Sequence, residues 1–153
     1  MSDISSKEIK KLRDETGAGV MDVRSALLES SGDIEKAKGI LKEKGLEKAS
    51  EKADRETAEG LIETYIHSGG KIGAMVFVAC ETDFVARTDE FKNLAREVAM
   101  QVASMNPTTI EELLEQEYIR DTSKSIKELI AEVVAKTGEN IQIKKFSRFS
   151  LSD

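Results

Sequence analysis

The chain has 153 residues, of which 39% are hydrophobic and 34% are charged, and its formal net charge is −6. This composition predicts a globular protein of one or two small domains, and its acidic balance argues against nucleic-acid binding as the main role. The single cysteine excludes a disulfide framework and no apolar run approaches about 20 residues, so we predict a cytoplasmic protein that does not cross a membrane.

Three short helices are predicted in residues 1–46. Ser5 and Glu8 have the spacing of a capping box, and Gly17 interrupts the helix that follows them. A second helix comes next, and a third begins after Asp33 and is expected to end at Gly45. Apolar residues at three- and four-residue steps predict the helix faces that form a small bundle core: Ile9, Leu12, Val20, Val23, Leu27, Ile34, Ala37, Ile40 and Leu41.

Residues 47–59 are charged and almost free of large apolar side chains, which is typical of a solvated linker helix and marks a domain boundary. The pattern then becomes strand-like in the remaining domain, residues 60–153. Two β-rich runs, 61–67 and 72–80, are joined by the pair Gly69-Gly70. Such runs around a glycine turn predict an antiparallel hairpin.

Helices and one more strand are predicted after the hairpin. The segment 81–87 is expected to be irregular, and an amphipathic helix with apolar residues from Phe91 to Met105 ends before Pro107. A short helix opens at Thr109, and a capping box at Ser125 opens another that ends at Gly138. The last apolar run changes parity at Lys144-Lys145, which predicts a third strand with a bulge. The fold class is therefore α+β, with a three-stranded antiparallel sheet packed with helices.

The usual catalytic and metal-binding patterns are missing. Zinc sites need several Cys or His ligands, and the chain has one of each, so we expect no metal, no cofactor and no enzymatic activity. Cys80, His67 and Asp83 allow a thiol triad as one alternative. The other alternative, which we favour, is that Cys80 is a small buried residue at the end of a strand and that His67 is a solvated residue at a turn.

Two apolar side chains can each be interpreted in two ways, as packing within the protein or as a contact for a partner. Phe84 follows three polar residues in a loop, so it either folds back onto its own core or projects towards a partner. Met21 directly follows Val20, which we assign to the core stripe of the second helix, and it either fills a gap or forms an exposed contact near the glycine turn. The sequence pattern alone leaves both alternatives open.

Three stretches resemble the elongation factor Ts family. Residues 12–22 (LRDETGAGVMD) are similar to its first signature, residues 80–87 (CETDFVAR) to its second, and residues 138–146 (GENIQIKKF) to its closing strand. The resemblance covers essentially the whole chain and is weakest between residues 107 and 124. It implies a three-helix, ubiquitin-associated-like (UBA-like) module, a linker, and an α+β core with a three-stranded sheet.

The resemblance also implies a function and the residues that perform it. Members of the family act as guanine-nucleotide exchange factors for elongation factor Tu, and the match implies that Asp83 and Phe84 enter its GTPase domain near the magnesium and phosphate site. Thr82 and Val85 are implied to support that loop. The N-terminal module is implied to contact the same domain through Arg13, Val20, Met21 and Arg24.

Two further expectations follow. Long family members have two core modules, whereas this chain has room for one, and short members are thought to work as homodimers. A sheet face with Ile141, Ile143 and Phe149 is therefore expected to form a self-complementary dimer interface.

The alternative function is a UBA-like protein-binding adaptor without exchange activity, because the three-helix module alone fits either role. The function of an exchange factor is favoured because an adaptor does not need the loop at residues 82–85.

Overall fold

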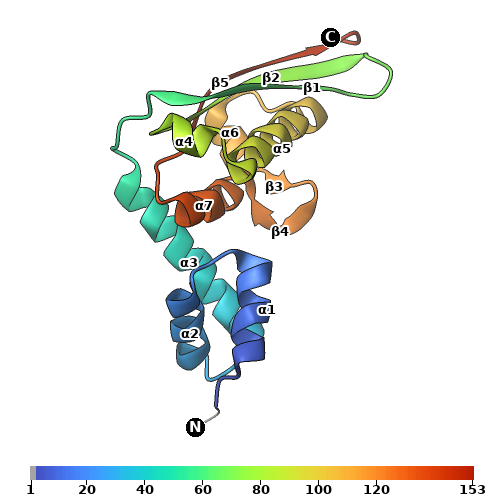
Figure 1. Ribbon diagram of the computed structural model, residues 1–153. Helices are drawn as coiled ribbons and strands as arrows, with labels where there is room; N and C mark the ends of the chain where they lie inside the picture. Colours follow the sequence, from blue (N-terminus) through green and yellow to red (C-terminus); the bar gives the residue numbers. More distant parts are fainter. Residues whose placement is uncertain (1–2) are drawn as a thin grey trace.

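The computed structural model describes residues 3–153, and the chain begins with three helices that pack on one another (Figure 1). They are α1 (Ser6–Thr16), which starts with the predicted capping box, α2 (Val20–Glu29), and α3 (Ile34–Lys52), which starts at the predicted cap Asp33. Gly17 ends α1 with φ of 71°, a left-handed conformation that favours glycine. The three helices share a small buried core made of Leu12, Val23, Ala26, Leu27, Ala37 and Leu41.

Helix α3 is longer than the sequence pattern predicts. It was expected to end at Gly45, but it continues to Lys52, and the residues expected to form a linker are divided between the end of this helix and a short connection. A glycine inside a helix costs about 1 kcal/mol relative to alanine, which packing can outweigh. Ala49 packs against the main hydrophobic core, so contacts beyond Gly45 hold the helix together.

The second half of the chain is built on the predicted three-stranded antiparallel sheet. Strand β2 (Ile72–Cys80) lies in the centre, between β1 (Glu59–Ile66) and β5 (Gln142–Ser150). Phe77 pairs with Lys145 but its neighbour Val78 pairs with Ile143, so the bulge near Lys144 is confirmed. The bulge keeps apolar residues of β5 directed to the core on both sides of it.

Helices pack on one face of the sheet. They are α4 (Asp83–Ala86), α5 (Asp89–Met105) and α6 (Ile110–Glu115), and α5 contacts both β1 and β2. Helix α7 (Ile126–Thr137) packs in turn against α5 and α6. Helix α4 replaces the irregular segment that was expected there, while α7 has the predicted capping box and ends at Gly138. The fully buried side chains of this larger core include Val76, Val78, Phe91, Val98, Val102, Leu113 and Ile126.

A small hairpin that the sequence did not predict lies beside α5. It consists of β3 (Glu117–Tyr118) and β4 (Asp121–Ser125). The hydroxyl of Tyr118 donates a 2.6 Å hydrogen bond to Glu97 of α5, and Arg120 forms a 2.7 Å ion pair with the same carboxylate. Burial, together with this hydrogen bond, raises the pKa of Tyr118.

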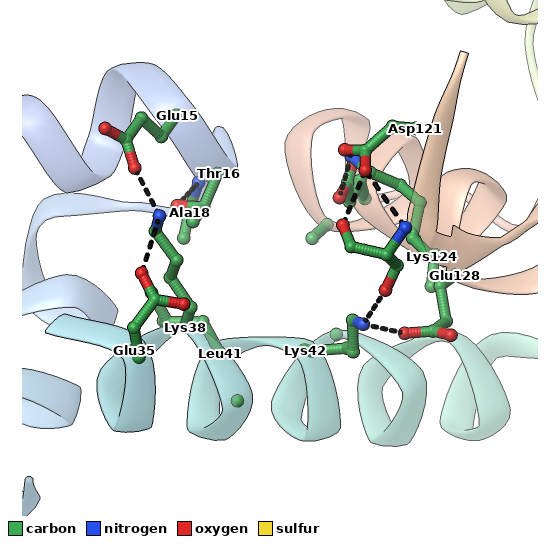
Figure 2. Close-up of a pocket in the computed structure, with 16 residues that line it drawn as sticks. Glu15, Thr16, Ala18, Glu35, Lys38, Leu41, Lys42, Asp121, Lys124 and Glu128 are labelled. Atoms are coloured by element: carbon green, nitrogen blue, oxygen red, sulfur yellow. Dashed lines mark hydrogen bonds and ion pairs between the residues drawn. The ribbon is translucent and has the colours of Figure 1, made fainter. Parts of the chain in front are cut away.

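The N-terminal helices are attached to the rest of the protein where α3 packs against α7. Lys42 of α3 forms a 2.8 Å ion pair with Glu128 of α7 and donates a 2.6 Å hydrogen bond to the Ser123 carbonyl (Figure 2). A cleft of about 550 Å³ lies along this contact. Its charged side chains already pair within the protein, as Lys38 does with Glu15 at 2.8 Å.

Across residues 3–153, no helix combines the length and the apolar character that a membrane crossing requires.

Candidate functional site

Phe84 projects from a short helical turn at the end of the sheet. It belongs to α4, which connects β2 to α5, and 78% of its side chain is exposed. The next two residues, Val85 and Ala86, are 4% and 5% exposed and anchor the turn in the main core. The alternative that Phe84 folds back onto its own core is therefore wrong. An isolated exposed phenylalanine on an anchored backbone can insert into a partner surface.

Polar residues shape this turn. Thr82 is its N-cap, and the Thr82 hydroxyl accepts a 3.3 Å hydrogen bond from the Val85 amide. Asp83 and Arg87 are both exposed and form a 2.8 Å ion pair one helical turn apart. The negative charge of Asp83 at the start of α4 is therefore held by Arg87, next to the residue that carries the projecting ring.

One residue that supports the turn was missed by the sequence analysis. The Glu139 carboxylate, just after α7, accepts hydrogen bonds from the backbone at Glu81 and Thr82. Nothing in the local pattern around Gly138 indicates a partner that is 57 residues distant in the chain. Only the resemblance of residues 138–146 to a family stretch drew attention to this segment.

The four predicted contact residues of the N-terminal module are all exposed. Arg13 lies on α1, and Val20, Met21 and Arg24 lie in the first turns of α2. Val20 was assigned to the core stripe, which is wrong, because 44% of its side chain is exposed while Val23 and Leu27 of the same helix are buried. Met21 is 70% exposed, so the gap-filling alternative is also wrong.

The three predicted interface residues do not share a face. Ile141 and Ile143 are buried in the main core, whereas Phe149 is 76% exposed. The bulge is the cause, because it reverses which positions of β5 point inwards. Ile143 pairs with buried Val78, and Phe149 pairs with Gly73 on the opposite face.

That opposite face of the sheet carries several exposed apolar side chains, and no helix of residues 3–153 packs on it (Figure 1). We call it the outer face. The pairing of Ile62 with Phe77, and the alternation of side chains along each strand, place its exposed apolar residues together. They are Ile62, Ile66, Met75, Phe77 and Phe149. Ile62 and Phe77 belong to the two runs that predict the hairpin, but their sequence pattern does not indicate that they remain exposed.

The structure does not assemble the alternative thiol triad. Cys80 is completely buried, and its Sγ donates to the Thr82 carbonyl at 3.1 Å. Burial raises the pKa of the Cys80 thiol to about 11, and the negative charge of Glu139 adds to the effect. His67 lies at the turn of the hairpin, the opposite end from Cys80, and its Nδ1 is 3.1 Å from the Tyr65 hydroxyl. Residues 3–153 contain no cluster of three or more His, Cys, Asp or Glu side chains arranged to hold a metal ion.

Comparison with known proteins gives consistent results. The family described as Elongation factor TS matches residues 81–153. The chain is 44% identical to Elongation factor Ts of Caldanaerobacter subterraneus subsp. tengcongensis over 191 aligned positions, which cover 95% of this chain and 96% of the relative. It is 41% identical to Elongation factor Ts of Desulfosudis oleivorans over 198 positions, with 100% of both proteins covered. Both alignments are longer than the 153 residues of the chain, so both relatives contain residues without a counterpart here.

A third relative is longer. Elongation factor Ts of a Nostoc species is 46% identical over 153 positions, which include 100% of this chain but 48% of the relative.

Proposed function

This chain belongs to the elongation factor Ts family and is a translation elongation factor, and from that premise we propose that it promotes GDP release from elongation factor Tu. In this proposal Asp83 and Phe84 enter the GTPase domain of the partner near its magnesium and phosphate site. Phe84 displaces the segment that positions the ion, and Asp83 adds negative charge beside the phosphates. No covalent bond is made or broken in the chain.

The observation that supports this proposal most strongly is the exposure of Phe84 on an anchored turn. Its side chain is 78% exposed, although its two following neighbours are core residues. Binding reciprocity supplies the mechanism: if the protein and GDP bind the partner less well together than separately, each weakens the other by the same factor.

The free energy involved indicates that Phe84 does not act alone. Burying one phenylalanine contributes about 1.5–3 kcal/mol. Each 1.4 kcal/mol of coupling changes an affinity about tenfold. Lowering the affinity of the partner for GDP by several powers of ten therefore requires roughly 4 kcal/mol or more. We assign the remainder to the N-terminal module, where Val20 and Met21 are exposed on α2 and exposed Arg24 follows them by four and three residues.

We further propose that the chain acts as a homodimer formed through the outer face. A row of exposed isoleucine, methionine and phenylalanine side chains on a sheet without covering helices is a surface that a second copy can bury. This replaces the interface first expected from Ile141 and Ile143, since both belong to the core of one subunit.

The direct test is the release of a fluorescent GDP analogue from elongation factor Tu at fixed free magnesium. The expected result is acceleration at substoichiometric concentrations of this protein, because an exchange factor is released after each event. Tight binding without acceleration would instead support the alternative of a UBA-like adaptor. The absence of both binding and acceleration would contradict the assignment of elongation factor Tu as the partner.

A further inference from the structure

A turn of four residues cannot hold its own conformation, so something outside α4 must fix Phe84. Forming a first helical turn is unfavourable because several dihedral angles are fixed for one hydrogen bond. Val85 and Ala86 anchor the later part of α4 in the core. The backbone before Phe84, at Glu81 and Thr82, needs a second attachment if the ring is to point in one direction.

Glu139 provides that attachment. Its Oε1 accepts hydrogen bonds from the amides of Glu81 at 3.1 Å and Thr82 at 2.9 Å, and its Oε2 accepts one from the Thr82 hydroxyl at 2.7 Å. The same hydroxyl accepts from the Val85 amide, so the carboxylate orients the cap of α4 as well as the chain before it. Hydrogen bonds to an ionised carboxylate are about twice as strong as bonds between neutral groups.

The attachment is reciprocal. Glu81 Oε1 accepts a 3.1 Å hydrogen bond from the Asn140 amide, so each segment donates to a carboxylate of the other. The Asn140 side chain is 3% exposed and donates to the carbonyls of Ala53 at 3.3 Å and Arg55 at 2.8 Å, just after α3. Adjacent residues of one turn therefore hold both the base of the Phe84 turn and the end of the helix that carries the N-terminal module.

We infer that Glu139 is a positioning residue for exchange: its carboxylate fixes the direction in which Asp83 and Phe84 project. This inference rests on the proposed function. Three donors converge on this carboxylate, and an uncharged amide at the same place accepts two of them at most through its oxygen. The rate of GDP release is expected to be highest with Glu at position 139, lower with Gln and lowest with Ala.

The test compares Glu139→Ala with Glu112→Ala. Glu112 is a matched control because its carboxylate also accepts from a threonine amide and hydroxyl, those of Thr108, but at the start of α6. We expect Glu139→Ala to lower the maximal rate of GDP release about tenfold or more, with a much smaller change in the half-saturating concentration. Glu112→Ala is expected to change neither by more than about twofold.

A double variant separates positioning from general stability. If Glu139 acts through Phe84, adding Glu139→Ala to Phe84→Ala lowers the rate by less than about twofold further, because effects of coupled residues do not add. Full multiplication of the two effects would overturn the inference. Glu139→Gln keeps the shape of the side chain and is expected to fall between the wild type and Glu139→Ala, which provides a second variant if the alanine variant does not fold.

Amide hydrogen exchange gives a readout independent of elongation factor Tu. In Glu139→Ala the amides of Thr82 and Val85 are expected to exchange about tenfold faster or more, while those of α7 keep their protection. Unchanged protection at Thr82, or a wild-type rate of GDP release in Glu139→Ala, would overturn the inference and leave the proposed function standing. Failure of the wild-type protein to accelerate GDP release would instead overturn the proposed function, and the inference with it.

Discussion

At the residue scale, a side chain can act on a partner only if its neighbours keep it out of its own core. Val85 and Ala86 have this role for Phe84, since both are buried and turn the ring outwards. Phe91, one helix further on, is 0% exposed and fills the main core. Two phenylalanines seven positions apart thus have opposite environments, because Phe91 lies on the buried stripe of α5 whereas Phe84 lies on the exposed side of α4.

Cys80 gives a prediction at this scale. Because burial raises its pKa to about 11, the thiol is protonated at neutral pH and its thiolate forms only as the pH approaches that value. We expect iodoacetamide at pH 8 to modify the folded protein at least about a hundredfold more slowly than the unfolded protein, whose thiol has a pKa near 8.5.

The unfolded protein is the matched control, since Cys80 is the only cysteine. Cys80→Ser is expected to leave GDP release unchanged. Rapid alkylation of the folded protein at pH 8, together with loss of function in Cys80→Ser, would support the thiol alternative instead.

At the element scale, most helices and strands could be predicted because each has a local signal. The capping boxes at Ser5 and Ser125, the glycine turn of the hairpin and the parity change at Lys144 all lie where the sequence placed them. The continuation of α3 past Gly45 could not be predicted, since it depends on packing against distant residues. The β3–β4 hairpin is held by the hydrogen bond from Tyr118 to Glu97, which no local sequence pattern indicates.

The site was predictable to a similar degree. Phe84 and its neighbours were identified from their motif, but that motif does not give the direction of the ring. The contribution of Glu139 depends on a hydrogen bond across 57 residues, which neither periodicity nor capping rules describe. Ile141 and Ile143 were wrongly placed on the same face as Phe149, because the face that each residue occupies depends on the position of the bulge within one residue.

The contact of α3 with α7 predicts a dependence on pH. Burial alone would raise the pKa of Glu128, but its hydrogen bonds with Lys42 and Ser125 and the Lys42 charge outweigh this and hold the pKa below its ordinary value. A lowered pKa in the folded state means that the ion pair stabilises the protein above the unfolded pKa and is lost as the pH falls through the folded one.

Lys42→Met is therefore expected to lower the free energy of unfolding by up to about 1 kcal/mol at neutral pH, since the lysine is partly exposed and screened by solvent. The difference from the wild type should shrink in acid, where Glu128 is protonated and the hydrogen bond from Lys42 to the Ser123 carbonyl remains. Denaturant unfolding across the pH range measures it. Lys44→Met is the control, because Lys44 lies on the same helix and, within residues 3–153, its ammonium group has one hydrogen bond, to the Ser25 hydroxyl at 3.4 Å, and no ion pair. A deficit that persists unchanged in acid would show that Lys42 acts through packing or its hydrogen bond to Ser123 and not through its ion pair with Glu128.

At the scale of the whole molecule, the proposed contacts lie on different parts of an elongated protein. The N-terminal helices and the sheet are at opposite ends in Figure 1, with α3 and α7 between them. The outer face is directed away from the helices. In this arrangement a second copy on the outer face leaves the N-terminal module uncovered. One relative is about twice as long as this chain, and we propose that a second subunit supplies what the additional length provides there.

The dimer predicts a change of mass without a change of fold. Ile62→Lys places a charge on the outer face, and burying an unpaired charge is costly, so it is expected to produce monomers at concentrations where the wild type is a dimer. Sedimentation equilibrium measures the mass, and a cooperative melting transition of the monomeric variant excludes unfolding, although loss of the dimer lowers its midpoint by mass action. Leu28→Lys, an exposed leucine on α2 remote from the sheet, is the control. A wild-type protein that remains at 16.9 kDa throughout micromolar dilution would contradict the dimer.

The role proposed for Phe84 in GDP release is tested by measuring the rate of release as a function of the concentration of wild type, Phe84→Ala and Met105→Ala. Met105 is a suitable control because it is also apolar and exposed but lies at the end of α5, outside the proposed contacts. We predict that Phe84→Ala lowers the maximal rate at least about tenfold and changes the half-saturating concentration much less, while Met105→Ala resembles the wild type. Equal losses of rate and of affinity in Phe84→Ala would contradict this role, because the ring would then contribute to binding alone.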